Sequence, residues 1–142
     1  MSGSEAQFQI STLERGVIRV AMMGELDIAQ AKQFQQVLDD LIGKGQTRLL
    51  IDLSPVSFID SSGLGVLLHA VRRLRRRRGR LAVVCPDPMM RELFELVGHN
   101  LLFPIEDTQE KALTHLVGRR RFAPSRRSPG SPSGSPPPTS AA

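Results

Sequence analysis

Residues 52–71 read DLSPVSFIDSSGLGVLLHAV, and this stretch decides how the rest of the chain is interpreted. A short apolar strand ends in Asp52 and runs into a loop, which delivers two serines and two glycines to the start of an amphipathic helix. Free backbone N–H groups and the positive end of the helix dipole gather at such a point. We therefore expect a serine hydroxyl there to be exposed and able to carry a phosphate.

The charge is distributed unevenly along the 142 residues. Residues 1–118 hold 14 basic and 14 acidic side chains, whereas residues 119–142 add five arginines and no acid, which accounts for the net charge of +5. The high pI is therefore weak evidence for nucleic-acid binding. We expect residues 1–118 to form one domain. Residues 119–142, rich in Ser, Pro, Arg and Gly, form a predicted disordered tail.

Cysteine content and hydropathy favour a cytoplasmic protein. Cys85 is the only cysteine, so the chain cannot form an internal disulfide, and a reducing compartment is expected. No apolar run approaches the roughly 20 residues that span a bilayer. The first residues lack the basic and apolar regions of a signal peptide. We expect no membrane insertion.

The apolar periodicity predicts alternating strands and helices. Residues 8–12 and 17–23 form a predicted hairpin, and Gly24 to Asp27 end the second strand, with Asp27 as the cap of a helix that ends near Gly43. Further predicted strands are 48–52, 81–85 and 102–105, and further predicted helices are 61–78, 88–97 and 108–117. This order implies an α/β domain. About five strands form a mixed sheet, an N-terminal hairpin plus parallel strands, packed with about four helices. The apolar stripes expected to face inward are Ala31, Phe34, Leu38 and Leu41 in the first helix, and Met90, Leu93, Phe94 and Val97 in the helix at 88–97.

Several nucleotide and hydrolase motifs are absent from the sequence. Gly63 and Gly65 follow a strand as in a dinucleotide loop, but the third glycine is replaced by Leu68. The chain has no Walker lysine, and no Gly-x-Ser-x-Gly elbow surrounds Ser61 or Ser62. We expect no cofactor.

Isolated titratable residues argue against catalysis and metal binding. The three histidines fall on different predicted elements: His69, His99 and His115. Asp52 and Asp60 could form a carboxylate pair, but we interpret Asp52 as a strand end and Asp60 as a helix cap. The pattern is typical of a protein that is bound or modified, and not of an enzyme.

Residues 58–66, FIDSSGLGV, closely resemble the signature of the STAS domain family. Residues 24–27, GELD, are similar to the second landmark of that family, and residues 83–85 and 91–98 resemble its later strand and short helix. The resemblance covers roughly residues 5–118. Within the family, the chain looks like the bacterial anti-sigma factor antagonists.

The resemblance implies a switch. Such antagonists bind an anti-sigma factor, usually an ATP-dependent serine kinase, and thereby release a sigma factor. Phosphorylation of the first serine, Ser61 in this chain, blocks binding, and a phosphatase restores it. The residues implied in partner binding are Asp27, Asp60, Ser61, Ser62, Gly63 and Leu64. A monomer or weak dimer is expected, without direct nucleic-acid binding.

Other interpretations of the same residues stay open. Each serine could simply cap the helix, and we expect Ser61 to be the phospho-acceptor and Ser62 to be a cap. The same fold could serve as a scaffold of a stress-signalling complex or as an accessory subunit of a membrane transporter. A hydrolase using Ser61 is the rival from another class, although no base is placed beside that serine.

Residues 72–80 read RRLRRRRGR, which departs from the pattern expected of the family. The first interpretation is an exposed helix end, where cations meet the negative end of the dipole. A binding site for an acidic patch on a partner is the second. Nucleic acid is the third, because no aromatic residues stand between the arginines to stack on bases.

Overall fold

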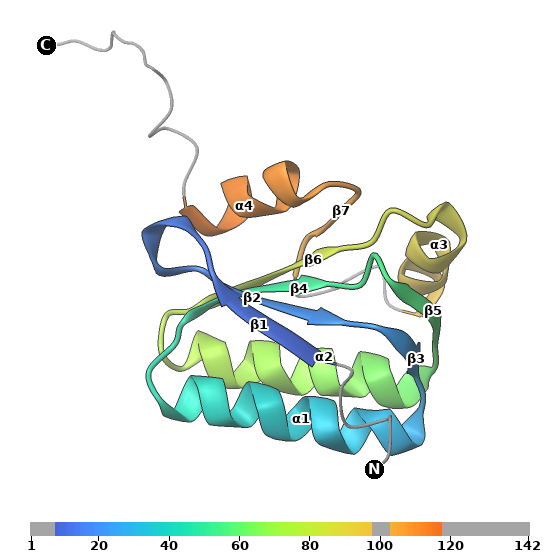
Figure 1. Cartoon of the computed structure of the whole chain (residues 1–142), viewed down its shortest axis with the longest axis horizontal. Coiled ribbons are helices and arrows are strands. Elements are labelled where there is room, and N and C mark those ends of the chain that lie inside the picture. Colours follow the sequence, from blue (N-terminus) through green and yellow to red (C-terminus); the bar gives the residue numbers. More distant parts are fainter. Residues whose placement is uncertain (1–7, 98–102, 118–142) are drawn as a thin grey trace, which may run out of the picture.

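The computed structural model describes residues 8–97 and 103–117 (Figure 1). The strands are β1 (Phe8–Thr12), β2 (Ile18–Met22), β3 (Gly24–Leu26), β4 (Arg48–Asp52), β5 (Val56–Ile59), β6 (Arg80–Val84) and β7 (Ile105–Glu106). The helices are α1 (Ile28–Gly43), α2 (Ser61–Arg75), α3 (Pro88–Val97) and α4 (Gln109–Val117), and a short 3-10 turn, η2 (Glu14–Gly16), joins β1 to β2.

The larger sheet has five strands in the order β1-β2-β4-β6-β7. Only β1 is antiparallel to its neighbour, and the other pairs are parallel. The predicted N-terminal hairpin and parallel sheet are therefore confirmed. The last strand was predicted at 102–105 but lies at Ile105–Glu106, and residue 102 and the predicted tail at 119–142 lie outside the described residues.

A second sheet was not predicted from the sequence. It consists of the short parallel pair β3 and β5. The interpretation of residues 53–60 as a loop is therefore wrong, because residues 56–59 form a strand. Two of the paired residues, Leu26 and Ile59, are buried, whereas the neighbouring pair Glu25 and Phe58 is exposed. The pair lies at the end of the molecule where α1 and α2 begin (Figure 1).

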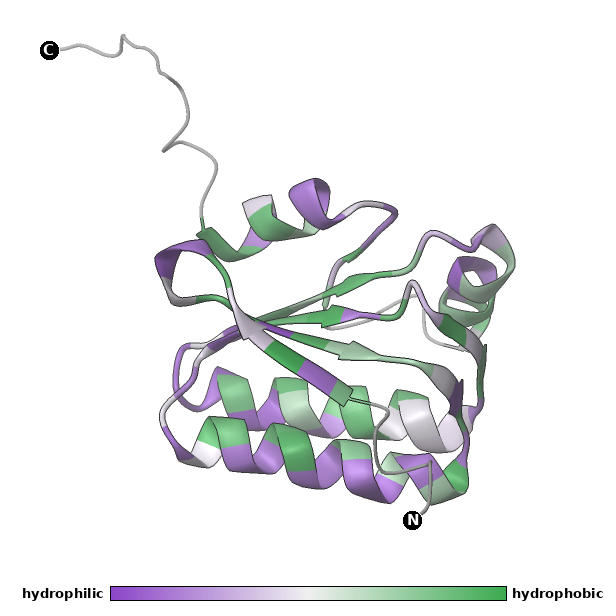
Figure 2. Cartoon of the chain, in the orientation of Figure 1, coloured by the Kyte–Doolittle hydropathy of each residue, from purple (hydrophilic) through white to green (hydrophobic). Residues whose placement is uncertain are grey.

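Helices cover the two faces of the large sheet unequally. Helices α1 and α2 lie side by side on one face, and α4 lies on the other (Figure 1). Alternation along the strands supplies both layers, since Leu49 and Ile51 join the cluster under α1 and α2 whereas Leu50 joins the one under α4. Figure 2 shows that the large sheet is mostly apolar and that α1 and α2 carry polar residues outward. Among the helices of the described residues, none has both the length and the apolarity that crossing a bilayer requires.

Helix α2 ends earlier than predicted. It was predicted to extend to residue 78 but stops at Arg75, and Arg78 adopts a left-handed conformation with φ of 59°. The next residue, Gly79, packs closely against the backbone, since a Cβ there would lie 2.5 Å from the carbonyl oxygen of Thr47. The glycine therefore allows the chain to enter β6 close beside the start of β4.

Helix α3 does not bury the whole predicted stripe. Met90 and Phe94 are buried as predicted, and Phe94 packs edge-to-face on Phe103. Leu93 was predicted to face inward, but it is 42% exposed. The side chain of Val97, also predicted to be buried, lies outside the described part of the chain. An apolar surface therefore remains on α3.

Gly63 allows the first turn of α2 to lie directly on the small sheet. A Cβ at this position would lie 2.6 Å from Cγ of Leu26 and 2.9 Å from Cγ1 of Ile59. Carbon atoms do not approach so closely, so any side chain at this position would push α2 away from β3 and β5. Gly65, two residues later, faces open space.

These two glycines give opposite predictions for substitution by alanine. Gly63→Ala is expected to lower the free energy of unfolding by about 1–3 kcal/mol, because the added methyl group overpacks the contact with Leu26. Gly65→Ala is the matched control and is expected to raise it by about 0.4–1 kcal/mol, since alanine favours the helix and meets no neighbour. Urea unfolding followed by far-ultraviolet circular dichroism measures both, and equal stability of the two variants would contradict the close approach.

Candidate functional site

Two helix N-termini lie side by side at one end of the molecule. Leu26 pairs with Ile59 across the small sheet, so the next residues, Asp27 and Asp60, begin α1 and α2 at adjacent places. The backbone N–H of Asp60 donates to the carbonyl oxygen of Leu26 at 3.4 Å. The sequence landmarks at 24–27 and 58–66 are thereby brought together by β3 and β5.

Both aspartates cap their helices, as predicted. Asp27 Oδ1 accepts a hydrogen bond from the Gln30 N–H at 3.1 Å. Asp60 Oδ1 accepts from the N–H groups of Ser62 at 2.9 Å and Gly63 at 3.3 Å. The prediction that Ser62 caps the helix is wrong, because Asp60 takes that position and Ser62 lies in the first turn.

Ser61 is the first residue of α2 and is exposed, as predicted. Ser62 is half-buried, and Gly63 and Leu64 are buried. A group attached to the Ser61 hydroxyl would therefore extend into solvent without disturbing the core. The dipole of α2 favours negative charge at this position.

An apolar groove with a volume of about 320 Å³ lies beside Ser61. It runs between the start of α2 and helix α3. The lining residues are Ile59, Asp60, Ser61, Leu64, Leu93 and Phe94. Apart from Asp60 and Ser61, the walls are hydrocarbon, so a partner that fills the groove with an apolar side chain would place its own atoms next to the serine hydroxyl.

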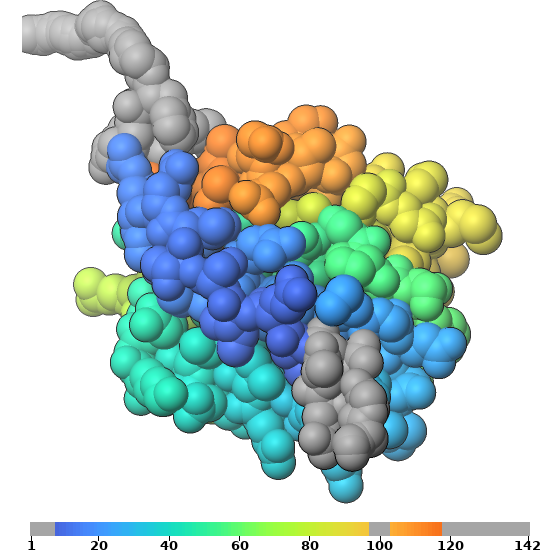
Figure 3. Space-filling view, viewed as in Figure 1, coloured from blue at the N-terminus to red at the C-terminus, as the bar shows by residue number. Residues whose placement is uncertain are grey.

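Large exposed apolar side chains are concentrated around this end of the molecule. Except for Ile10 on β1, those in the described residues belong to the segments around β3, β5, α3 and the start of α1: Met23, Ile28, Phe58, Met89, Leu93 and Leu96. Figure 3 shows the segments of β3 and β5 and the turn into α3 next to one another at one end of this face. Such gathering is typical of a protein–protein contact surface.

This apolar surface was not predicted from the sequence. The signal was nevertheless present in α3, where Met89, Leu93 and Leu96 recur at helical spacing on a stripe of their own. Phe58 gave no such signal, because it directly precedes the apolar Ile59 in a segment that was interpreted as a loop.

Asp52 does not belong to the site around Asp60. Its Oδ2 atom lies 2.6 Å from Nη2 of Arg19, and this ion pair joins β4 to β2. Burial raises the pKa of Asp52, but hydrogen bonds from the side chain and backbone N–H of Ser54, together with the Arg19 guanidinium, outweigh burial and hold the pKa below its ordinary value. The Asp52 carboxylate therefore stabilises the fold at the end of β4, as predicted.

The histidines described by the structure have separate partners. His69 lies 3.8 Å from Asp39 of α1, whereas His115 Nε2 lies 2.7 Å from Glu106 Oε2 of β7. His99 lies outside the described residues. Within residues 8–97 and 103–117, no three His, Cys, Asp or Glu side chains gather as metal ligands would.

Comparison with known families shows that the model of the STAS domain matches residues 10–112. The chain belongs to the STAS domain family. The match contains both capped helix N-termini, the small sheet and Ser61. The fold expected from the sequence resemblance is thereby confirmed.

Relatives in the STAS family support this assignment in sequence and in structure. The Anti-sigma F factor antagonist of Paenibacillus polymyxa is 33% identical over 103 residues, which cover 72% of this chain and 88% of the relative. The crystal structure of an anti-sigma factor antagonist from Mycobacterium paratuberculosis gives a TM-score of 0.71 at 29% identity, covering 82% of this chain and 98% of that one.

A third STAS relative has been solved in two chemical states. The Bacillus cell fate determinant SpoIIAA in its phosphorylated form gives a TM-score of 0.60 at 29% identity, covering 76% of this chain and 97% of that one. Its unphosphorylated form gives a TM-score of 0.61 at 28% identity, covering 76% of this chain and 96% of that one. Both states of that relative therefore share this fold.

The Asp52 ion pair predicts a specific dependence of stability on pH. Because the folded-state pKa is lowered, the ionised carboxylate stabilises the protein above its unfolded pKa of about 3.9, and this stabilisation is lost as the pH falls through the folded-state pKa. Asp52→Asn is expected to cost about 1.5–3 kcal/mol at neutral pH and to flatten the acid limb of the profile.

Urea unfolding at a series of pH values measures this effect. Asp40→Asn serves as the control, because the Asp40 carboxylate is 64% exposed in its pair with Lys44, and its acid limb should match that of the unmodified protein. An unchanged slope in Asp52→Asn would show that the pair with Arg19 contributes nothing to acid stability.

Proposed function

We propose that this chain is an anti-sigma factor antagonist that is switched off by phosphorylation at Ser61. The observation that carries the proposal is the position of Ser61, exposed at the start of α2 and on the rim of an apolar groove. The names of the relatives support it, as do the two chemical states of SpoIIAA. In this role, the unphosphorylated chain binds an anti-sigma factor and so releases a sigma factor.

The docking surface consists of the groove and the exposed apolar side chains around it. Phe58, Leu93 and Leu96 would supply the contacts, because burying such side chains is the main favourable term in association. Asp27, Asp60 and Ser62 would lie beside the contact. Gly63 and Leu64 would act as buried residues. Gly63 allows α2 to pack closely on the small sheet, and Leu64 forms part of the groove wall.

Phosphorylation would oppose the complex and leave the fold intact. The anti-sigma factor would itself be the kinase, transferring the terminal phosphoryl group of ATP to Ser61 Oγ and releasing ADP, and a separate phosphatase would reverse the step. The phosphate adds about −1.5 to −2 charge beside Asp60. Because the start of α2 favours negative charge, the chain tolerates it. A partner packed in the groove would instead bury that charge away from water, which would lower the affinity of the complex.

The proposed role is that of a binding partner and phosphorylation substrate, and not of an enzyme. The Asp60 carboxylate already accepts two backbone N–H groups of α2. Among the described residues, no histidine is hydrogen-bonded to Ser61. Within residues 8–97 and 103–117, Ser61 therefore has no histidine partner of the kind that activates the nucleophile of a serine hydrolase.

Replacing Ser61 by aspartate tests the switch. The immobilised chain is first used to recover its partner from a lysate of the source cells, with mass spectrometry to identify an anti-sigma kinase. Ser61→Asp is expected to weaken binding of that purified kinase by at least about tenfold in calorimetry, or about 1.4 kcal/mol. Ser61→Ala is expected to retain binding and to incorporate no phosphate from labelled ATP.

The charge-matched control is Gln36→Glu, which adds one negative charge on the exposed side of α1 and is expected to leave binding unchanged. Equal binding by Ser61→Asp and the unmodified chain would overturn the switch. Recovery of a transporter or of a large assembly in place of a kinase would keep the fold and overturn the function.

Truncating the exposed part of the groove tests the docking surface. Leu93→Ala is expected to weaken kinase binding about tenfold, since it removes apolar contact next to Ser61. Ile10→Ala is the control, because Ile10 is similarly exposed but lies on β1. Equal affinities of the two variants would show that α3 lies outside the interface.

A further inference from the structure

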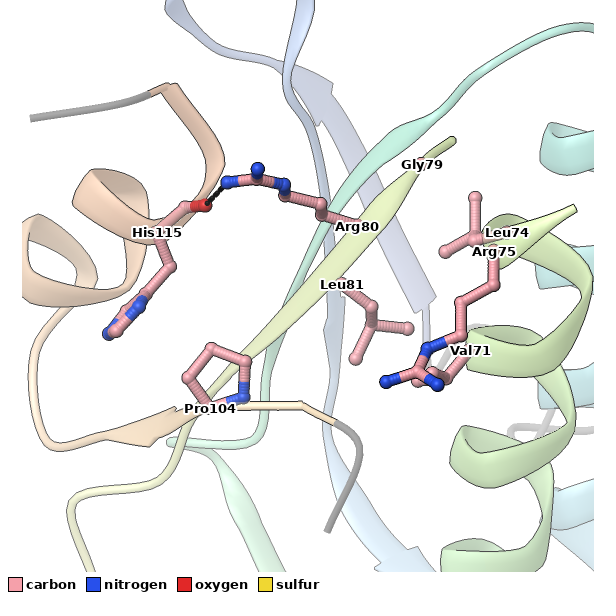
Figure 4. A pocket seen from close by; sticks show the side chains of 8 residues that line it. All are labelled: Val71, Leu74, Arg75, Gly79, Arg80, Leu81, Pro104 and His115. Atoms are coloured by element: carbon pink, nitrogen blue, oxygen red, sulfur yellow. Dashed lines mark hydrogen bonds between the residues drawn. The ribbon is translucent and has the colours of Figure 1, made fainter. Parts of the chain in front are cut away.

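A second cavity, with a volume of about 340 Å³, lies at the opposite end of α2 from Ser61. Its apolar floor is formed by the partly exposed Pro104 and by small exposed parts of Val71 and Leu81, each 4% exposed, above the fully buried Leu74. Arg75, Arg80 and His115 line its sides. Figure 4 shows Leu81 between the α2 residues on one side and Pro104 on the other. The cavity therefore combines hydrocarbon with positive charge.

The arginines at this end exceed what the fold uses. Arg73 pairs with Asp39 at 2.7 Å, and Arg77 donates to the carbonyl oxygen of Ile42, so these two tie α2 to α1. Arg80 donates to the carbonyl oxygen of His115 at 3.1 Å (Figure 4). In contrast, Arg75 is exposed, and no carboxylate of the described residues forms an ion pair with it.

Further arginines lie near the end of α2 and at the starts of β4 and β6. Arg48 and Arg80 are register partners on the neighbouring parallel strands β4 and β6, and both are exposed. Arg72, Arg76 and Arg78 are also exposed. Like charges placed side by side on neighbouring strands destabilise a sheet. An anionic partner would remove that repulsion and supply the missing counter-charge.

Acidic residues are scarce in the parts of the sequence outside the described residues. Residues 1–7 contain a single acid, Glu5, and residues 98–102 and 118–142 contain none. The five arginines of the C-terminal segment would be repelled by this site. An acid on another molecule therefore fits the charge of this site better than these segments do.

We propose that this cavity, with Arg75 and Arg80, binds an acidic segment of a partner protein. The carboxylates of that segment accept hydrogen bonds from the two guanidinium groups, whose fork geometry suits them. An apolar side chain of the same segment rests on Pro104 and on the exposed parts of Val71 and Leu81. A nucleic-acid backbone would satisfy the arginines but has no group for the apolar floor, and no Phe, Tyr or Trp lines the cavity for base stacking.

The acidic segment and the partner at Ser61 can bind together. Helix α2 has 15 residues and spans about 20 Å, so its two ends present separate surfaces. This inference is independent of the proposed function, since it needs neither phosphorylation nor an anti-sigma factor.

Fluorescence anisotropy with two labelled peptides tests the site on the full chain. One is a short oligoglutamate that carries two leucines, and the other replaces the leucines by serines. The leucine peptide is expected to bind at least about fivefold more tightly, because only it fills the apolar floor. Arg75→Glu, and separately Arg75→Gln, are expected to weaken its binding at least about tenfold, with circular dichroism to verify the fold.

Two controls separate this site from general electrostatics. Lys32→Glu changes the net charge as much as Arg75→Glu but lies on the exposed side of α1, and it is expected to leave peptide binding within about twofold. Ser61→Asp is likewise expected to leave it unchanged, because it alters the other end of α2.

Four outcomes would overturn the assignment. Equal binding of the two peptides would show that the cavity is not used. Equal weakening by Lys32→Glu would show attraction by net charge alone. Tighter binding of duplex DNA or phosphatidylglycerol vesicles, lost in Arg75→Glu, would assign the site to a different ligand. Self-association in analytical ultracentrifugation that disappears in Arg75→Glu would assign it to a second copy of the chain.

Discussion

The close approach of α2 to the small β3–β5 sheet is the constraint on which the functional end of the molecule depends. Gly63 permits it, since a single methyl group there would collide with Leu26 and Ile59. With the helix seated so closely, Asp60 can cap it and Ser61 emerges as its first exposed residue. The same seating brings Leu64 to the wall of the groove. The glycine in the signature is therefore a packing residue, which holds the serine in place from inside.

The sequence predicted the parts of this arrangement that follow from local rules. Helix caps at Asp27 and Asp60, the inward stripe of α1, and the hairpin-plus-parallel sheet follow from residue type and periodicity, and all are present. The pairing of β3 with β5 was missed because it joins two short segments about thirty residues apart, and neither segment shows a strand signal by itself. The exposure of Leu93 was missed because a periodic stripe does not reveal where the neighbouring core ends.

Helix α2 carries two kinds of surface at its two ends. Its first turn adjoins apolar groups and the carboxylates of Asp27 and Asp60, whereas its last turn and the following residues are crowded with arginine. Only part of that positive charge is used inside the fold, chiefly to fasten α2 to α1 through Arg73 and Arg77. This polarity favours opposite classes of contact at the two ends, hydrophobic docking beside Ser61 and charge-assisted binding beside Arg75.

Because the helices cover the two faces of the sheet unequally, the two faces differ in how easily they unfold locally. Helix α4 has nine residues and buries only Ala112, Leu116 and Val117, whereas α1 and α2 share a much larger cluster with the sheet. Local unfolding costs least where little apolar surface is buried. Amide protons of α4 should therefore exchange with solvent well before those of α2, in a partial opening that uncovers Leu50 and Val84 and leaves the Ser61 end folded. The layer of α1 and α2, which carries the serine, is thus expected to be locally more stable than α4 on the other face of the sheet.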